Sequence, residues 1–374
     1  MKRLTLLTGR LRRRHYILLV LLLAVALTRS IPGGGAMYTR HIYPIIGGIL
    51  SPISGCIPFA VGDLFIALSL AWVIIYPCYA ILKKGKKKTA IFLHVAEYLL
   101  WVYAWFYIAW GLNYSQPNFY SRTGIQPVAV SQVAFKRFAY RYAHDLNQSF
   151  GQAFYLHQYG KPIPIEDTET SEENKNTEKA ILSEYAKIGS KEGINPSFNP
   201  NPHAKTMLFS PLSSMAGVTG SMGPFFCEFT LNGEVLPHEY PAIYAHEYAH
   251  FLGISNEGEA NLYSYIVCTA SRNKYVRFSG YYHILFHVLA NVYNILGEKE
   301  GDEYIKHIHP QIIKMAKGDR LYWNNKRCTL LDDLQNIAFD IYLKGNNVSE
   351  GRKSYSGVIG LILAYETSSD ALAQ

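Results

Sequence analysis

The chain has few charged residues for its length. Only 17% of its 374 residues are Asp, Glu, Lys or Arg, whereas about a quarter of a soluble chain is usually charged. Hydrophobic residues make up 49%. This balance argues against an ordinary cytosolic enzyme, and it also argues against a disordered protein, which would have too little apolar surface to bury.

Cysteines are also few, and they lie far apart. None of the five has a neighbour at the spacing of a CxxC pair. The pattern therefore excludes a disulfide framework and a cysteine-based zinc site as the main organising feature. We expect most of these thiols to be small buried hydrophobic groups. They are Cys56, Cys78, Cys227, Cys268 and Cys328.

The positive charge of the chain is confined to its first third. The net charge is +8, but residues 1–88 contain 13 Lys or Arg and a single acid, Asp63, a net +12 that leaves −4 for the remaining 286 residues. A nucleic-acid-binding domain would need a basic face on its folded part. We therefore expect no nucleic-acid partner.

Long uncharged runs in the first 112 residues predict a membrane region. Segments 64–82 and 91–112 are long enough to cross a bilayer, although the second contains His94 and Glu97. The shorter run 16–28 is interpreted as a first span, with a cleaved signal peptide as the alternative. Segment 42–61 is interrupted by Pro52 and Pro58 and is interpreted as an interfacial segment or loop.

A lysine cluster predicts the orientation of these spans. Five lysines lie between Lys83 and Lys88, and such clusters stay cytoplasmic. Residues 113–374 are then extracytoplasmic, whether or not the first run is cleaved.

In this domain we expect a mobile acid-rich loop at about 162–178 and a strand within 225–231, followed by a turn at Asn232 and Gly233. Expected helices cover 130–157, 179–188, 241–253, 257–272, 275–297, 301–316, 329–344 and 354–366.

The sequence His246-Glu247-Tyr248-Ala249-His250 is an HExxH motif. On a helix, residues i and i+4 share one face, so both imidazoles can reach one metal ion, and Zn²⁺ is the expected cofactor. Glu247 lies beside the first ligand, where a general base for a water molecule belongs. It is the predicted catalytic residue.

A third ligand is expected from the next helix, which Asn256 is suited to cap. A carboxylate in its first turn could return to the same ion, leaving one open position as in catalytic zinc sites. Glu257 and Glu259 both lie in that turn.

The run Glu257-x-x-x-Asn261 after HExxH resembles the Glu-x-x-x-Asp of gluzincin metallopeptidases. The resemblance implies that Glu257 binds zinc, with Glu259 as the alternative, and that Asn261 orients a ligand histidine. Asn261 replaces the usual Asp, so it brings a hydrogen-bond acceptor without a charge. The gap from His250 to Glu257 is also shorter than in most gluzincins.

Beyond this motif, most of the chain resembles an uncharacterised family of bacterial membrane-anchored HExxH proteins, classed as a domain of unknown function. The resemblance rests on segments 57–64, 110–114, 217–220, 279–281 and 363–365 as well as the HExxH region. It implies a bacterial inner-membrane, multi-pass protein with its C-terminal domain on the periplasmic side. The implied fold class is mainly α, with N-terminal transmembrane helices followed by an α+β zincin-like extracytoplasmic domain with few strands.

Other candidate residues remain open. Zincins commonly present an edge strand above the site helix, and 225–231 is the candidate here, with a core strand as the alternative. Tyr281, Tyr282 or His283 could supply a donor to an oxyanion. His283 and His287 repeat the i, i+4 spacing, and we interpret them as packing residues, with a second metal site as the alternative.

The predicted function is a membrane-anchored zinc metallopeptidase whose partners are the lipid bilayer and a peptide or protein substrate. The first alternative is a non-catalytic zinc-binding scaffold or envelope sensor. An intramembrane protease is disfavoured because the segments around HExxH are too polar for lipid. A channel using His94 and Glu97 would have little machinery with three spans.

Overall fold

The computed structural model describes residues 12–83, 85, 87–154, 171–189, 193–194, 204–346 and 357–373. These residues are mainly helical, and they contain one small sheet. The chain divides into two compact units. Unit 1 comprises residues 1–116 and 223–228, and unit 2 comprises residues 117–222 and 229–374.

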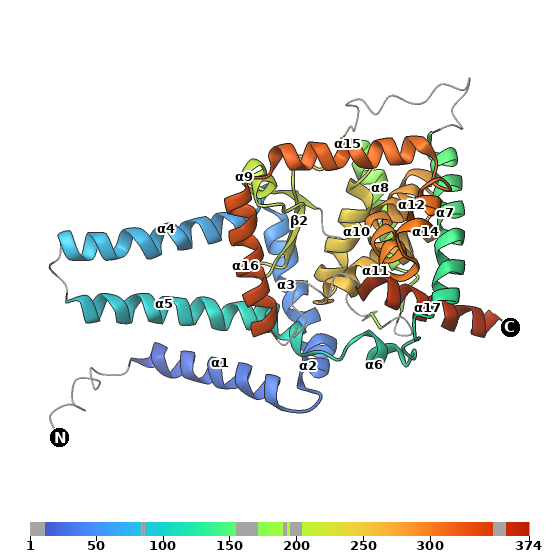
Figure 1. The fold of residues 1–374 in the computed structure, drawn as a ribbon. Helices are drawn as coiled ribbons and strands as arrows, with labels where there is room; N and C mark the ends of the chain where they lie inside the picture. Colours follow the sequence, from blue (N-terminus) through green and yellow to red (C-terminus); the bar gives the residue numbers. More distant parts are fainter. Residues whose placement is uncertain are drawn as a thin grey trace. The chain divides into compact units, whose positions relative to one another are not determined.

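Unit 1 is built from helices. It contains α1 (Arg13–Ser30), α2 (Gly34–Met37), the π-helical turn η1 (Tyr38–Ile42), α3 (Tyr43–Gly55), α4 (Val61–Leu82), α5 (Lys88–Ala109) and the 3₁₀ turn η2 (Gly111–Ser115). Helices α4 and α5 run side by side as a hairpin (Figure 1).

Helices α4 and α5 correspond to the two stronger predicted spans. Each has 22 residues and is long and apolar enough to cross a membrane, which indicates that the protein associates with one. Helix α5 lies three residues earlier than predicted. It ends at Ala109 because the backbone of Trp110 leaves the helical region, with φ of −155°.

The first predicted span is not supported as a simple crossing. Segment 16–28 lies inside α1, but α1 meets the length and apolarity needed for a span only together with Gly34–Gly55, from which it is bent by 113°.

The interpretation of 42–61 as a loop is wrong over most of its length. Residues 43–55 form α3, which accommodates Pro52 within the helix.

A loop from later in the chain also belongs to unit 1. Residues 223–228 form the tip of a β-hairpin, where Phe225 packs on Phe65 with ring centroids 4.9 Å apart. The indole Nε1–H of Trp105 donates to the carbonyl of Phe225 at 2.9 Å. The N–H of Gly62 donates to the Glu228 carboxylate at 2.6 Å. Polar and aromatic contacts thus fasten this tip to α4 and α5.

Unit 2 contains most of the remaining elements. They are α6 (Phe119–Thr123), α7 (Gln132–Phe154), α8 (Ser171–Tyr185), β1 (Lys205–Thr206), α9 (Ser210–Met215), β2 (Gly220–Gly223), β3 (Glu228–Leu231), α10 (Tyr240–Phe251), α11 (Glu257–Ala270), α12 (Lys274–His283), α13 (Leu285–Asn291), the π-helical turn η4 (Val292–Leu296), α14 (Glu298–Ile305), α15 (Pro310–Lys326), α16 (Thr329–Gly345) and α17 (Val358–Ala373). The tips of β2 and β3 are the residues counted with unit 1.

Several predicted boundaries in unit 2 are corrected. The acid-rich segment expected to be a loop is helical from Ser171 onward, whereas residues 162–170 lie outside the described part of the chain. The expected helix 275–297 breaks at Ile284. The expected helix 301–316 divides into α14 and α15, because Pro310 begins a new helix that His309 caps.

The sheet has the order β1-β3-β2. Strand β1 runs parallel to β3, with Lys205 opposite Thr230 and Thr206 opposite Leu231. The central strand is β3, so the expectation that 225–231 would be an edge strand is wrong. The edge on the other side of β3 is β2, and four residues connect the two strands, which is a hairpin length.

Buried aromatic residues pack α10 between this sheet and the other helices. Phe229 of β3 contacts Tyr244 with ring centroids 5.2 Å apart, and both side chains are fully buried. Helix α10 also packs against α11 and α12. Burial on several sides fixes the rotation of α10, and therefore the direction in which its two histidines point.

Candidate metal centre

The HExxH motif lies in α10, a buried helix with defined ends. Pro241 occupies the first turn, where its missing N–H costs no hydrogen bond. The helix ends at Phe251, and Gly253 takes a φ of +97°, which favours glycine. His246 and His250 lie on one face with ring centroids 4.7 Å apart.

Three potential ligand atoms converge at the start of α11. Nε2 of His250 lies 3.1 Å from Nε2 of His246, and Oε2 of Glu257 lies 3.2 Å from each of these nitrogens. Ligands about 2.05 Å from a tetrahedral zinc ion would be separated by about 3.3 Å. We call His246, His250 and Glu257 the candidate triad. Its separations fit one ion equidistant from all three.

The hydrogen bonds of the two imidazoles support this fit. Nδ1 of His250 donates to the carbonyl of Ile254 at 2.7 Å, and Nδ1 of His246 donates to Oδ1 of Asn261 at 2.8 Å. In the neutral imidazoles the Nε2 lone pairs then face each other and the Glu257 carboxylate. A proton or a metal ion shared by these three atoms would remove the repulsion between them.

The charge balance of the triad points the same way. Burial lowers the pKa of His250, but the Glu257 carboxylate outweighs it and raises that pKa to about 9. Burial raises the pKa of Glu257, while His250 and His246 outweigh it and hold the pKa well below its usual range. A metal ion would replace the proton on His250, since both need the same lone pair.

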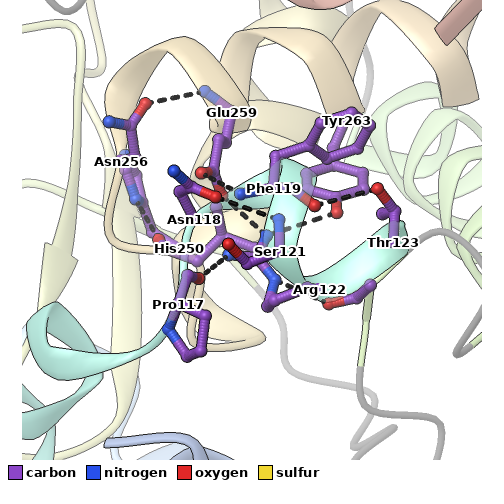
Figure 2. A network of polar contacts seen from close by, with 12 residues as sticks. Pro117, Asn118, Phe119, Ser121, Arg122, Thr123, His250, Asn256, Glu259 and Tyr263 are labelled. Carbon is purple, nitrogen blue, oxygen red and sulfur yellow. Dashed lines mark hydrogen bonds and ion pairs between the residues drawn. The ribbon is translucent and has the colours of Figure 1, made fainter. Parts of the chain in front are cut away.

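Glu259, the alternative ligand, is engaged elsewhere (Figure 2). Its Oε1 accepts the backbone N–H of Phe119 at 2.8 Å, and its Oε2 accepts from the Arg122 guanidinium at 2.6 Å. Asn256 caps α11 by accepting the backbone N–H of Glu259 at 3.0 Å. The cap fixes the first turn so that Glu257 lies with the imidazoles and Glu259 lies against α6.

Asn261 connects the triad to a third histidine. Its Oδ1 accepts from Nδ1 of His246 and, at 3.0 Å, from Nε2 of His283. Burial, with a smaller effect of His246, lowers the pKa of His283 to about 3, so this imidazole is neutral. Sequence reasoning singled out His283 but not this role, which depends on α12 crossing α11.

Glu247 is buried beside the triad with one unsatisfied oxygen. The residue is 5% exposed, and its Oε2 has no hydrogen-bond partner among the described residues. Burial raises its pKa, against the lowering effect of His246 and His250. Gly220 of β2 leaves room for this carboxylate, because a Cβ there would lie 2.3 Å from Oε1. In the sequence, Gly220 belongs to the segment 217–220 that carries part of the family resemblance, but no pattern there indicated that it would lie against Glu247.

The three candidate oxyanion donors have other partners. The hydroxyl of Tyr282 donates to Asp319, and Nε2 of His283 donates to Asn261. The ring of Tyr281 packs edge-to-face on Tyr265 with ring centroids 5.8 Å apart. Tyr282 and His283 therefore donate to groups other than the triad.

The comparisons with known proteins place the chain in a family. Residues 38–363 match the family model described as "Protein of unknown function (DUF3810)". The chain belongs to the DUF3810 family. The match includes α4, α5, the HExxH motif and the whole of α11, which confirms the expected membership of an uncharacterised family. No curated protein and no solved structure matches the chain.

A cavity of about 490 Å³ adjoins the centre of this DUF3810 protein. Its lining includes His283, Ile243 of α10 and Thr219 immediately before β2. Glu239 and Asp319 bring carboxylates to the wall, and Asp319 accepts from Nε2 of His238 at 2.7 Å. A group the size of an amino-acid side chain would fit there, one helical turn from the triad.

Proposed function

We propose that this protein is a membrane-anchored, zinc-dependent metallopeptidase that hydrolyses peptide bonds at the outer face of the bacterial inner membrane. The observation that carries the proposal is the convergence of the candidate triad to within 3.1–3.2 Å, with the unpaired carboxylate of Glu247 next to it. A structural zinc site would use all four coordination positions for protein ligands. In the part of the chain that the structure describes, three potential ligands meet at the triad, and a zinc ion held by them would have its fourth position open.

The donor set suits zinc. Two imidazole nitrogens and one carboxylate oxygen are the protein ligands of many catalytic zinc sites. A zinc ion bound there would polarise a carbonyl oxygen and lower the pKa of a water molecule. Asn261 and the Ile254 carbonyl hold the two rings so that both Nε2 atoms face inward.

Glu247 supplies the general base in this proposal. Its carboxylate takes a proton from the attacking water and delivers it to the nitrogen of the leaving amine. A buried carboxyl group with a raised pKa is suited to both steps, because it gains a proton more readily than an exposed one. The unsatisfied Oε2 provides the lone pair that accepts this proton.

The position of strand β2 favours a peptide as the substrate. The strand forms an edge of the sheet, and its Gly220 lies against the Glu247 carboxylate. An extended peptide can pair with such an edge through main-chain hydrogen bonds. Pairing there would bring a peptide bond close to the base, and the adjoining cavity would take a substrate side chain.

The outer-face location rests on charge and on the hairpin of α4 and α5. The lysine-rich segment 83–88 connects the two helices, so their other ends, Val61 and Ala109, lie on the opposite side of the membrane. With the lysines in the cytoplasm, the chain after α5 emerges outside. The domain that carries the triad follows directly.

The test uses the full-length protein and Glu247→Gln, which keeps the size of the side chain but removes the base. Both proteins should contain one zinc per chain by elemental analysis. Only the wild type should cleave members of a peptide library analysed by mass spectrometry. Equal cleavage by both proteins would contradict the role of Glu247. Stoichiometric zinc with no cleavage by the wild type would favour the scaffold or sensor.

A further inference from the structure

Helix α16 has a row of large aliphatic side chains on its outer surface. Leu330, Leu334, Ile337 and Ile341 are between 54% and 67% exposed. At 100° per residue they fall within a sector of about 60° on the helix. The acidic residues of α16 lie outside this sector. Scattered exposed leucines are ordinary, but four aligned on one helix face mark an interaction surface.

Helix α9 extends this apolar surface. It packs against α16, and the backbone N–H of Cys328, just before α16, donates to the carbonyl of Met215 at 3.0 Å. In and just before α9, Leu208, Phe209 and Leu212 are 40–54% exposed. We call these three side chains, with the four of α16, the apolar face of unit 2.

The covalent links between the two units keep unit 2 near a membrane. Helix α5 ends at Ala109, and unit 2 begins at Pro117. Eight residues span at most about 28 Å even when fully extended. The chain also returns from unit 2 to unit 1 at residues 223–228, where the hairpin tip is fastened to α4 and α5. If α4 and α5 cross a bilayer, these two short links therefore keep unit 2 near its surface.

Charges at the ends of α16 suit the same partner. Lys326 and Arg327 precede the helix, and Lys344 lies in its last turn. An amphipathic helix with an apolar stripe and basic residues beside it is typical of segments that lie in the interface of a membrane. Lys326 is paired with Glu234 and Lys344 with Asp340. Of the three, the exposed Arg327 is therefore the side chain placed to reach a lipid phosphate while the stripe is buried among acyl chains.

We propose that the apolar face of unit 2, centred on α16, inserts into the lipid interface of the bilayer that α4 and α5 span. Unit 2 is then held on the membrane surface by this contact as well as by its covalent links. The inference rests on α4 and α5 being spans and is independent of the metal chemistry. A second copy of the chain is the competing occupant.

Site-directed spin labelling of the full chain in lipid nanodiscs, one copy per disc, tests this. The accessible Cys56, Cys78 and Cys328 are replaced by serine. This triple-serine protein, treated with the spin label before any new cysteine is added, shows how much label the two buried cysteines take up. One nitroxide is placed at a time by Leu334→Cys or Ile337→Cys. Lys317→Cys, on an exposed position of α15, is the matched control.

The readout is the collision rate with oxygen, which concentrates in lipid, and with a water-soluble nickel chelate. Labels at positions 334 and 337 should collide more with oxygen and several-fold less with nickel than the label at position 317. High nickel accessibility at 334 and 337 would overturn the proposal, because the face would then be in water. Exclusion of both reagents would overturn it too, because protein would cover the face. Unchanged circular dichroism confirms that each variant is folded, and Leu330→Cys replaces any that is not.

Discussion

The Arg122 guanidinium and the Glu259 carboxylate form a buried ion pair with an N–O distance of 2.6 Å, and both side chains are at most 7% exposed. Burial lowers the pKa of Arg122, but Glu259 outweighs it and raises that pKa overall. The pair occupies Glu259 while Glu257, two residues earlier, lies with the histidines. Two carboxylates in one helical turn thus have separate roles, which can be tested separately.

Replacing either glutamate by glutamine should affect zinc binding differently. Glu257→Gln removes a ligand, so we expect zinc affinity to fall at least about 100-fold, and the metal-free protein should also lose the stabilising interaction between Glu257 and protonated His250. Glu259→Gln leaves a buried arginine without its counter-ion, which costs about 3 kcal/mol or more. Metal titration and thermal unfolding of both variants measure the two effects. Loss of zinc binding in folded Glu259→Gln would show that the assignment is reversed.

Asn261 should tune the metal site without touching the metal. Asn261→Ala removes the acceptor for both His246 and His283, so we expect zinc affinity to fall about 10- to 100-fold. Asn261→Asp keeps the acceptor and should retain wild-type affinity or exceed it. Competition with a chelator of known affinity gives both values. If the alanine and aspartate variants bind zinc equally, the hydrogen bond to His246 has no role in affinity.

Gly220 should be required for activity and not for metal binding. In Gly220→Ala the new methyl group would lie 2.3 Å from Oε1 of Glu247, so the carboxylate or β2 must move. We expect peptide hydrolysis to fall at least about 10-fold, because small displacements of catalytic groups are costly. Zinc content should be unchanged. The control is Gly318→Ala on α15, where a Cβ would meet no atom within 4 Å and full activity is expected.

Glu239 should make folding stability depend on pH. Burial raises its pKa above the ordinary 4.5, so the folded state favours the protonated form and stability is lost as pH rises through that region. Glu239→Gln cannot ionise and still accepts from Trp323. It should therefore unfold at a higher temperature than wild type at pH 7 and at about the same temperature near pH 4.

Circular dichroism at both pH values measures the difference for Glu239→Gln. The control is Glu173→Gln, an exposed position on α8, where no change is expected. A lower unfolding temperature for Glu239→Gln at pH 7 would mean that the charged carboxylate stabilises the fold, contrary to the expectation.

Local patterns in the sequence determined much of this protein. Uncharged runs identified α4 and α5, because the cost of placing charge in lipid is a property of single residues. The i, i+4 spacing of His246 and His250 predicted a shared face, because helix geometry alone sets it. Asn256 marked the start of α11, because capping depends only on residues within one helical turn.

Only the tertiary structure decided the rest. Glu257 and Glu259 are equivalent by spacing, and they were separated by Arg122, which lies more than 130 residues away in sequence. The edge position of β2, the space left by Gly220 and the bond from His283 to Asn261 likewise depend on elements brought together by folding. Local geometry follows from neighbouring residues, whereas partners in a buried site are set by how the whole chain packs.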